Sequence, residues 1–220
     1  QNRQEGDFTM VYGFPGTTEQ HVVSEYLKFI IEKERPARIE MRNHSLAVID
    51  AGMKASDLTR IQYSAKQASI ANAWKKSIGQ VEGLENLGAV KLKQDYEAKY
   101  KAMAISKPEW AKYASALATL NGLMAEGTKT EYNYAIGVEY FSVGPEYFKL
   151  VRSLEDLLTN YAKYMANNEL KGVLDKLQNT ADGFFKNFDA AVDRQIFLEL
   201  TKLYLSYSQQ ELKGTTVEQL

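Results

Sequence analysis

The sequence contains no cysteine, and its 220 residues include only 4 prolines and 14 glycines. A chain without cysteine has no disulfide, no thiolate metal ligand and no cysteine nucleophile. All-β domains need many turns, and turns are rich in glycine and proline. The scarcity of both residues therefore favours an all-α fold built from long helices.

The charges are balanced, because 27 Lys and Arg residues stand against 28 Asp and Glu residues. Proteins that bind nucleic acid need a basic excess to neutralise phosphates, so we expect no nucleic-acid partner. No apolar run approaches the about 20 residues needed to cross a bilayer, so we expect no membrane span. Hydrophobic residues make up 45% and charged residues 25% of the chain, which is the composition of an ordinary globular domain.

One segment near the start has the two-residue period of a β-strand. The apolar side chains that share one face of it are Phe8, Met10, Tyr12 and Phe14. The pattern predicts a strand over about 7–14 that ends at Pro15-Gly16. A single strand leaves its backbone N–H and C=O groups unpaired. We therefore favour a helical insertion excised from a larger β-containing protein, with a strand that pairs with a second copy, or an ordered arm, as alternatives.

The rest of the chain has helical spacing. Apolar residues three and four apart predict about eight helices, over approximately 18–33, 36–53, 56–79, 89–103, 106–120, 145–158, 170–187 and 190–209. Pro36 is expected to break the first helix and open the second. Ser56 is expected to cap the third, and Ser106-Lys107-Pro108-Glu109 is a capping-box pattern.

The helix predicted from Ser56 to Gly79 has two apolar stripes. Tyr63, Ile70, Trp74 and Ile78 form a bulky stripe that is typical of a core-facing side, whereas Ile61, Ala65, Ala68 and Asn72 form a stripe of mostly small residues roughly opposite. Small neighbours allow another backbone to approach closely, and an amide offers donors and an acceptor. Asn72 is therefore a candidate ligand-binding residue, and the alternative is a polar bridge to a neighbouring helix or loop.

Few residues carry recognisable chemistry. No glycine-flanked serine suggests a hydrolase nucleophile, so we assign no catalytic residue here. His21 with Glu25, and Glu40 with His44, have the four-residue spacing that could place two metal ligands on a helix face. Such pairs are far more often solvated, so we expect no metal and no cofactor.

Aromatic residues are dense between Tyr132 and Phe148. They could line a groove for a peptide or glycan, which would make the chain a self-contained helical binding or scaffold module. The simpler interpretation, which we favour, is that they pack between helices.

Four segments, in this order, resemble the bacterial dipeptidyl-peptidase 7 and 11 family of serine exopeptidases. They are Gly6–Gly16, Pro36–Ile39, Ala71–Gly79, and Phe184–Ala190 with Asp193-Arg194 and Phe197. The resemblance that these segments mark extends over nearly the whole chain, from about Gly6 to Tyr207. In that family the first segment ends a strand of a chymotrypsin-like barrel and leads into an inserted helical domain.

The resemblance implies that residues 1–16 are a stub of the barrel, 17–210 a helical cap domain, and 211–220 a stub that leads back to the barrel. It implies a parent enzyme that releases dipeptides from the free N-terminus of peptides, with its Ser, His and Asp outside this segment. The cap would gate the cleft, and Asn72, which matches a family asparagine, would help to bind the substrate α-amino group. It also implies a homodimeric parent in the periplasm or at the bacterial surface.

The sequence departs from the family pattern at several positions. Thr17 and Gln20-His21 stand where the family often has arginine and an Arg-Tyr pair, and Lys76 stands where a second asparagine is common. These differences affect the expected position of the first helix and the substrate preference. The side-chain preference at the second substrate position is not predicted, because the implied pocket belongs to the barrel.

Overall fold

A computed structural model describes residues 4–13, 19 and 21–207. In this part of the chain nine α-helices form: α1 Ser24–Phe29, α2 Arg35–Ala55, α3 Asp57–Asn86, α4 Ala89–Ser106, α5 Ala116–Val138, α6 Tyr147–Ser153, α7 Glu155–Ala166, α8 Leu170–Lys186 and α9 Ala190–Tyr207. Three shorter turns join them: the π-helical η1 Ile30–Glu34 and η3 Glu139–Val143, and the 3-10 helix η2 Pro108–Tyr113. The all-α prediction is confirmed.

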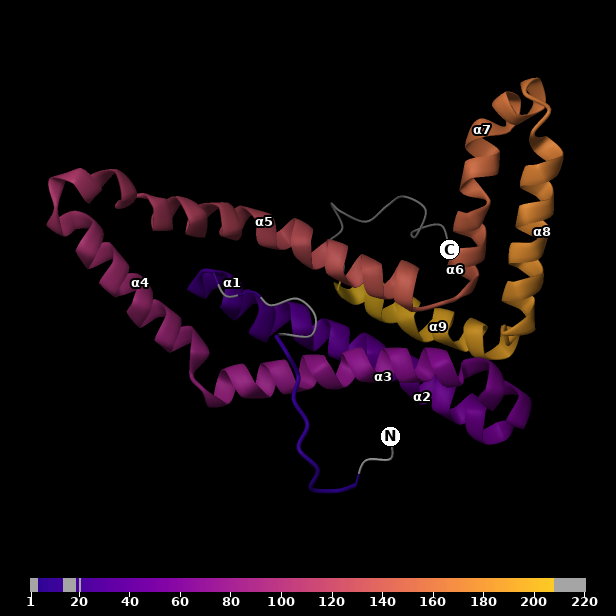
Figure 1. Ribbon diagram of the computed structural model, residues 1–220, viewed down its shortest axis with the longest axis horizontal. Coiled ribbons are helices and arrows are strands. Elements are labelled where there is room, and N and C mark those ends of the chain that lie inside the picture. The colour runs from indigo at the N-terminus through magenta and orange to yellow at the C-terminus, as the bar shows by residue number, and fades with distance from the viewer. Residues whose placement is uncertain (1–3, 14–18, 20, 208–220) are drawn as a thin grey trace.

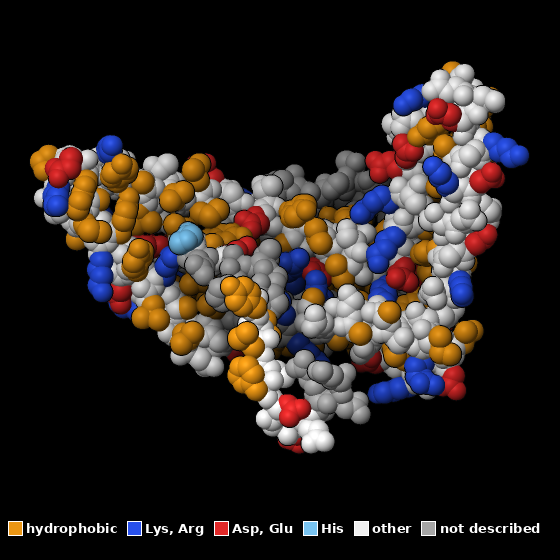
Figure 2. Space-filling model, in the orientation of Figure 1, with side chains coloured by type: hydrophobic (Ala, Val, Ile, Leu, Met, Phe, Trp, Pro, Cys, Tyr) orange, Lys and Arg blue, Asp and Glu red, His pale blue; other side chains and the backbone are white. Residues whose placement is uncertain are grey.

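The helices form a packed base with two projecting hairpins (Figure 1). Helices α3 and α9 both pack against α2, and α5 packs against α9. Helices α4 and α5 converge through η2 at one end, while α7 and α8 stand as an upright hairpin at the other. Figure 2 shows hydrophobic side chains gathered over the α4–α5 end, where Leu92, Leu120 and Leu123 are at least half exposed. None of the described helices is both long and apolar enough to cross a membrane.

The core lies where α2, α3, α5 and α9 meet. Its fully buried side chains include Met41, Ile49, Tyr63, Ile136 and Ile196. These residues come from four helices, so one continuous apolar cluster holds α2, α3, α5 and α9 together as the base.

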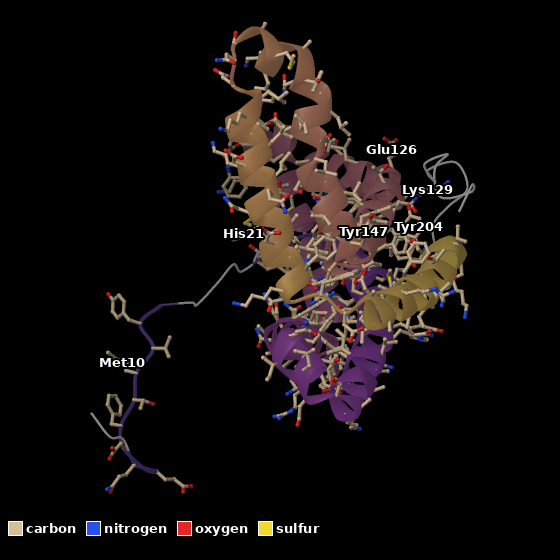
Figure 3. All side chains as sticks on the ribbon, turned by 90° about the vertical axis from the view of Figure 1, so that its right-hand side faces the viewer. Met10, His21, Glu126, Lys129, Tyr147 and Tyr204 are labelled. Carbon is tan, nitrogen blue, oxygen red and sulfur yellow. The ribbon has the colours of Figure 1, made fainter. Side chains whose placement is uncertain are left out.

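The strand predicted over 7–14 is not formed by the described residues 7–13, which have no regular secondary structure. Phe8, Met10 and Tyr12 are between 72% and 96% exposed. Figure 3 shows Met10 on a segment that runs away from the helices, and no strand among the described residues pairs with it. A strand needs a paired backbone, and a single alternating segment supplies only one half of it. Residues 14–18 and the C-terminal stub 211–220 lie outside the described part.

The prediction that Pro36 separates two helices is half right. Pro36 lies in the first turn of α2, as expected. The preceding segment stays helical, however, because η1 joins α1 to α2 and the Arg35 N–H bonds to the Ile30 carbonyl, five residues back. The wider π-helical turn ends where proline, which has no N–H to donate, begins the next helix. The first helix also begins at Ser24, six residues later than the expected start at 18.

The two predicted caps have opposite outcomes. The Ser56 side chain accepts a hydrogen bond from the Thr59 N–H at 3.2 Å, which confirms the cap of α3. The capping box at Ser106 is wrong, because α4 continues through Ser106 and its hydroxyl donates to the Met103 carbonyl. A side chain already used at the end of one helix is not available to cap the next. The chain continues instead into η2, which has no side-chain cap.

Gly144 is expected to be intolerant of a side chain. A Cβ built there would lie 2.7 Å from Leu200 Cδ1 and 2.8 Å from the Tyr140 carbonyl oxygen. Gly144→Ala should therefore lower the free energy of unfolding by about 1–3 kcal/mol. Gly127→Ala in the middle of α5 is the matched control, because no contact within 4 Å is found for its Cβ position among the described residues. It should raise stability by about 0.5–1 kcal/mol in urea unfolding, and a loss equal to that of Gly144→Ala would contradict the packing argument.

Candidate functional site

Helix α3 has one face in the core, as its bulky stripe predicts. A helix with two apolar stripes is expected to be covered on both sides, but the second stripe is exposed to solvent in the part of the chain that the structure describes. On the inner face Tyr63 and Ile70 are 0% and 4% exposed, and Trp74 packs against the core cluster from its edge. The Tyr63 hydroxyl donates to the Asp189 carbonyl at 3.3 Å. The inner face fixes the rotation of α3 about its axis, and therefore determines which residues face outward.

Asn72 lies on the outer face. The stripe of Ile61, Ala65, Ala68 and Asn72 is exposed along its whole length, and Ile61 is 71% exposed. The Asn72 amide makes no hydrogen bond with any residue in the described part of the chain. A polar bridge to another helix, the alternative function for this residue, is therefore not formed there. The amide is free to bind a group that reaches α3 from outside.

Polar contacts, which we call the polar joint, connect the N-terminal half of α3 to both ends of the segment α6–α8. This segment consists of the upright α7–α8 hairpin and the short helix α6 that leads into it. The Thr59 hydroxyl donates to Asp189 at 2.8 Å, and the Gln62 amide donates to the Lys186 carbonyl at 3.0 Å. Two turns along the same helix, the Lys66 ammonium donates to the Gly144 carbonyl at 3.0 Å. The segment is thus fixed to α3 at both ends, although none of its three helices has a buried residue.

Two buried groups of the joint have shifted pKa values. Burial lowers the pKa of Lys66 to about 8, against the opposing attraction of Glu146 and Asp193. Burial also raises the pKa of Asp193, although this carboxylate accepts the backbone N–H groups of Glu146 and Tyr147 at the start of α6. At the other end of the segment, the hydrogen bond from Thr59 lowers the pKa of Asp189. The Lys66 shift is large enough to affect stability near neutral pH.

The stability contributed at Lys66 is expected to rise with pH. The folded pKa of Lys66, about 8, lies below the ordinary value of 10.5. Between these two pH values the unfolded chain binds more protons than the folded chain, so the free energy of unfolding increases as the pH rises. The difference in unfolding free energy between the wild type and Lys66→Met should therefore increase by about 1 kcal/mol from pH 7 to pH 9. Urea unfolding of both proteins at pH 7, 8 and 9 measures it, and two parallel stability curves would contradict the shift.

A buried charge network that the sequence analysis did not identify joins the two π-helical turns to α2. Glu139 is 1% exposed and accepts two hydrogen bonds from Arg42 and one from Arg38, each at 2.8 Å. Arg38 also pairs with Glu34 at 2.8 Å. The available signal was two arginines four residues apart, on one face of a helix with an apolar opposite face. Nothing in the sequence indicated which carboxylate they would meet.

Neither of the two His–Glu pairs suggested by the sequence brings its side chains together in the structure. His21 precedes α1, which begins at Ser24, so His21 and Glu25 do not share a helix face. The His44 Nδ1 lies 3.5 Å from Glu199 on α9 rather than beside Glu40, which accepts a hydrogen bond from the Tyr207 hydroxyl. Among the described residues no group of three or more His, Asp or Glu side chains could hold a metal ion.

The aromatic segment from Tyr132 to Phe148 packs mainly into the core, as we favoured. Tyr140 is 0% exposed, stacks on Tyr204 with ring centroids 4.8 Å apart, and shares a hydrogen bond with Thr201 at 2.7 Å. Phe141 and Phe148 pack against the same cluster. Tyr134 and Tyr147 are exposed, but they are too few to make an aromatic groove.

The helical domain described above, with a free amide on an outer helix face, matches one family of peptidases over its whole length. The family model described as Peptidase S46 matches residues 1–220, and the chain belongs to this family.

The chain is also similar to several curated peptidases. It is 35% identical to an "Asp/Glu-specific dipeptidyl-peptidase" of Flavobacterium psychrophilum, over 94% of this chain and 29% of that protein. It is 32% identical to a protein of the same name from Capnocytophaga gingivalis, over 91% of this chain and 28% of that protein. It is 30% identical to a "Dipeptidyl-peptidase 7" of Phocaeicola vulgatus, over 91% of this chain and 28% of that protein. The chain therefore spans less than a third of the length of these relatives.

Proposed function

We propose that this chain is the helical cap domain of a longer serine dipeptidyl peptidase that releases dipeptides from the free N-terminus of peptides. The names of the relatives support dipeptide release, and the fraction of their length that the chain spans supports a domain rather than a whole enzyme. The catalytic Ser, His and Asp would lie in the barrel outside this segment. The parent would be a homodimer in the periplasm or at the bacterial surface.

The role of the cap would be to gate the cleft and to bind the amino end of the substrate. The observation that carries this proposal is the Asn72 amide, which is exposed on the outer face of α3 and makes no hydrogen bond in the described part of the chain. An amide oxygen can accept a hydrogen bond from an ammonium group without bringing a second charge that must be desolvated. A carboxylate of the barrel would supply the countercharge.

The proposal is tested by comparing the isolated chain with the full-length peptidase that contains it. The full-length protein should hydrolyse fluorogenic dipeptidyl amides with a free amino group, and it should not hydrolyse the same amides after N-acetylation. The isolated chain should hydrolyse neither. Dipeptide release by the purified 220-residue chain would disprove the assignment of catalysis to another domain.

The alternative, a self-contained binding module, depends on the aromatic segment. Most of that segment lies in the core, as described above, so no specific observation favours this alternative.

A further inference from the structure

A pocket of about 430 Å³ opens beside α3, on the C-terminal side of Asn72. Lys76, Gly79 and Gly83 line it from α3, and Arg35 and Glu19 line it from the opposite side. Apart from the adjacent backbone of α3, no atom of the described residues lies within 4 Å of the position that a Cβ would take at either glycine, so this side of the pocket is unobstructed. We call this hollow the Lys76 pocket.

The Lys76 pocket continues the outer stripe of α3. Lys76, Gly79 and Gly83 follow Asn72 by four, seven and eleven residues, so all four lie within about 60° of one another around the helix axis. With a rise of about 1.5 Å per residue, the pocket extends from about 6 to about 16 Å beyond Asn72 along α3. A ligand bound at Asn72 can therefore continue directly into the pocket.

The charges in the pocket favour an anion. The Lys76 side chain is exposed and makes no hydrogen bond or ion pair with any residue that the structure describes. Arg35 pairs with Glu34 at 3.0 Å, but its Nε has no hydrogen-bond partner within the described ranges. Glu19 is the carboxylate in the lining, so two cations stand against one anion. Lys76 is the cation that a ligand can reach without displacing an existing partner.

The position of the pocket identifies which part of a peptide could reach it. An extended peptide advances about 3.3–3.6 Å per residue. If the amino end lies at Asn72, the third to fifth residues lie at the depth of the pocket. Release of a dipeptide cleaves the bond between the second and third residues, so these residues belong to the peptide that leaves.

We propose that the Lys76 pocket binds a carboxylate side chain on the third to fifth residue of the peptide substrate. This proposal rests on the proposed function, because the amino end of the peptide must be held at Asn72. The chemistry is a charge-assisted contact between a Lys76 ammonium and a substrate carboxylate at the protein surface. It makes the full-length enzyme sensitive to residues beyond the bond that it cleaves.

The test uses the full-length peptidase and two free-amine pentapeptides that differ only in glutamate or glutamine at the fourth residue. The wild type should cleave the glutamate peptide with a kcat/KM about three- to fivefold higher, the range of a partly exposed ion pair. The ratio should fall to about 1 in Lys76→Gln, and 0.5 M NaCl should reduce it in the wild type. Glu19→Gln should increase the ratio, because it removes the competing carboxylate.

Lys75→Gln is the matched control, because Lys75 is also exposed on α3 but points about 100° away from Lys76 and does not line the pocket. It should keep the wild-type ratio. Equal rates on both peptides in the wild type, an unchanged ratio in Lys76→Gln, or equal losses in both lysine variants would overturn the proposal.

Hydrolysis of a fluorogenic dipeptidyl amide separates the two proposals. Its absence in the wild type would overturn the proposed function, whereas its presence with equal pentapeptide rates would overturn only the proposed role of the Lys76 pocket.

Discussion

Replacing Asn72 by alanine in the full-length peptidase is expected to lower kcat/KM for free-amine substrates by roughly 5- to 150-fold. This range corresponds to the about 1–3 kcal/mol lost when a polar contact to a charged group is removed. Truncation should not disturb the fold, because the amide is exposed and makes no hydrogen bond in the described part of the chain. Steady-state kinetics with fluorogenic dipeptidyl amides measure the effect.

Asn86→Ala is the control for this experiment. Asn86 is an exposed asparagine at the end of the same helix, so the chemical change is the same and the position is about 21 Å further along the axis. It should leave kcat/KM unchanged. An unchanged kcat/KM in Asn72→Ala would remove this residue from the site, and an equal loss in both variants would point to a general effect on α3.

Replacing Glu139 by alanine is expected to produce the largest loss of stability, about 3–5 kcal/mol. The substitution leaves two arginines in a partly buried position without the carboxylate that each binds at 2.8 Å. For a domain of this size the melting temperature should fall by about 6–20 °C. Thermal unfolding of the 220-residue chain, followed by circular dichroism, measures the change.

Two further variants define what the Glu139 result means. Glu126→Ala removes an exposed glutamate of α5, the helix that precedes Glu139, labelled in Figure 3, and should change the melting temperature by no more than about 1–2 °C. Replacing Glu139 by leucine together with Arg38 and Arg42 by methionine should recover most of the loss, because no buried charge is then left unpaired. A melting temperature unchanged by Glu139→Ala would show that the network does not stabilise the fold.

Most of the helices could be predicted from local signals. The helix predicted over 106–120 is wrong, because this stretch is η2 followed by the start of α5, which continues to Val138. The predicted 170–187 and 190–209 correspond closely to α8 and α9, because an amphipathic period and a junction of polar residues are local properties. Helix α3 continues to Asn86, seven residues beyond Gly79. A glycine costs about 1 kcal/mol in a helix, which packing of the neighbouring turns can offset. The π-helical turns at Glu34 and Glu139 had no local signal.

Part of the candidate site could be predicted from local spacing, and part depends on long-range packing. The two stripes of α3 identified Asn72 as an unusual residue from spacing alone. The Lys76 pocket could not be predicted, because half of its lining comes from residues between Glu19 and Arg35, far from α3 in the sequence. The carboxylate that Arg38 and Arg42 bind could not be predicted either, because Glu139 is about 100 residues away from them in the sequence.

The sequence by itself determined the helical class of the chain, the two faces of its longest helix and its family resemblance, because these depend on periodicity and on short motifs that are read locally. Only the tertiary structure decided that the Asn72 stripe of α3 is exposed, which carboxylate neutralises the arginines of α2, and where a hollow remains beside Lys76. Those outcomes depend on long-range packing of helices, which brings together side chains that no local pattern relates.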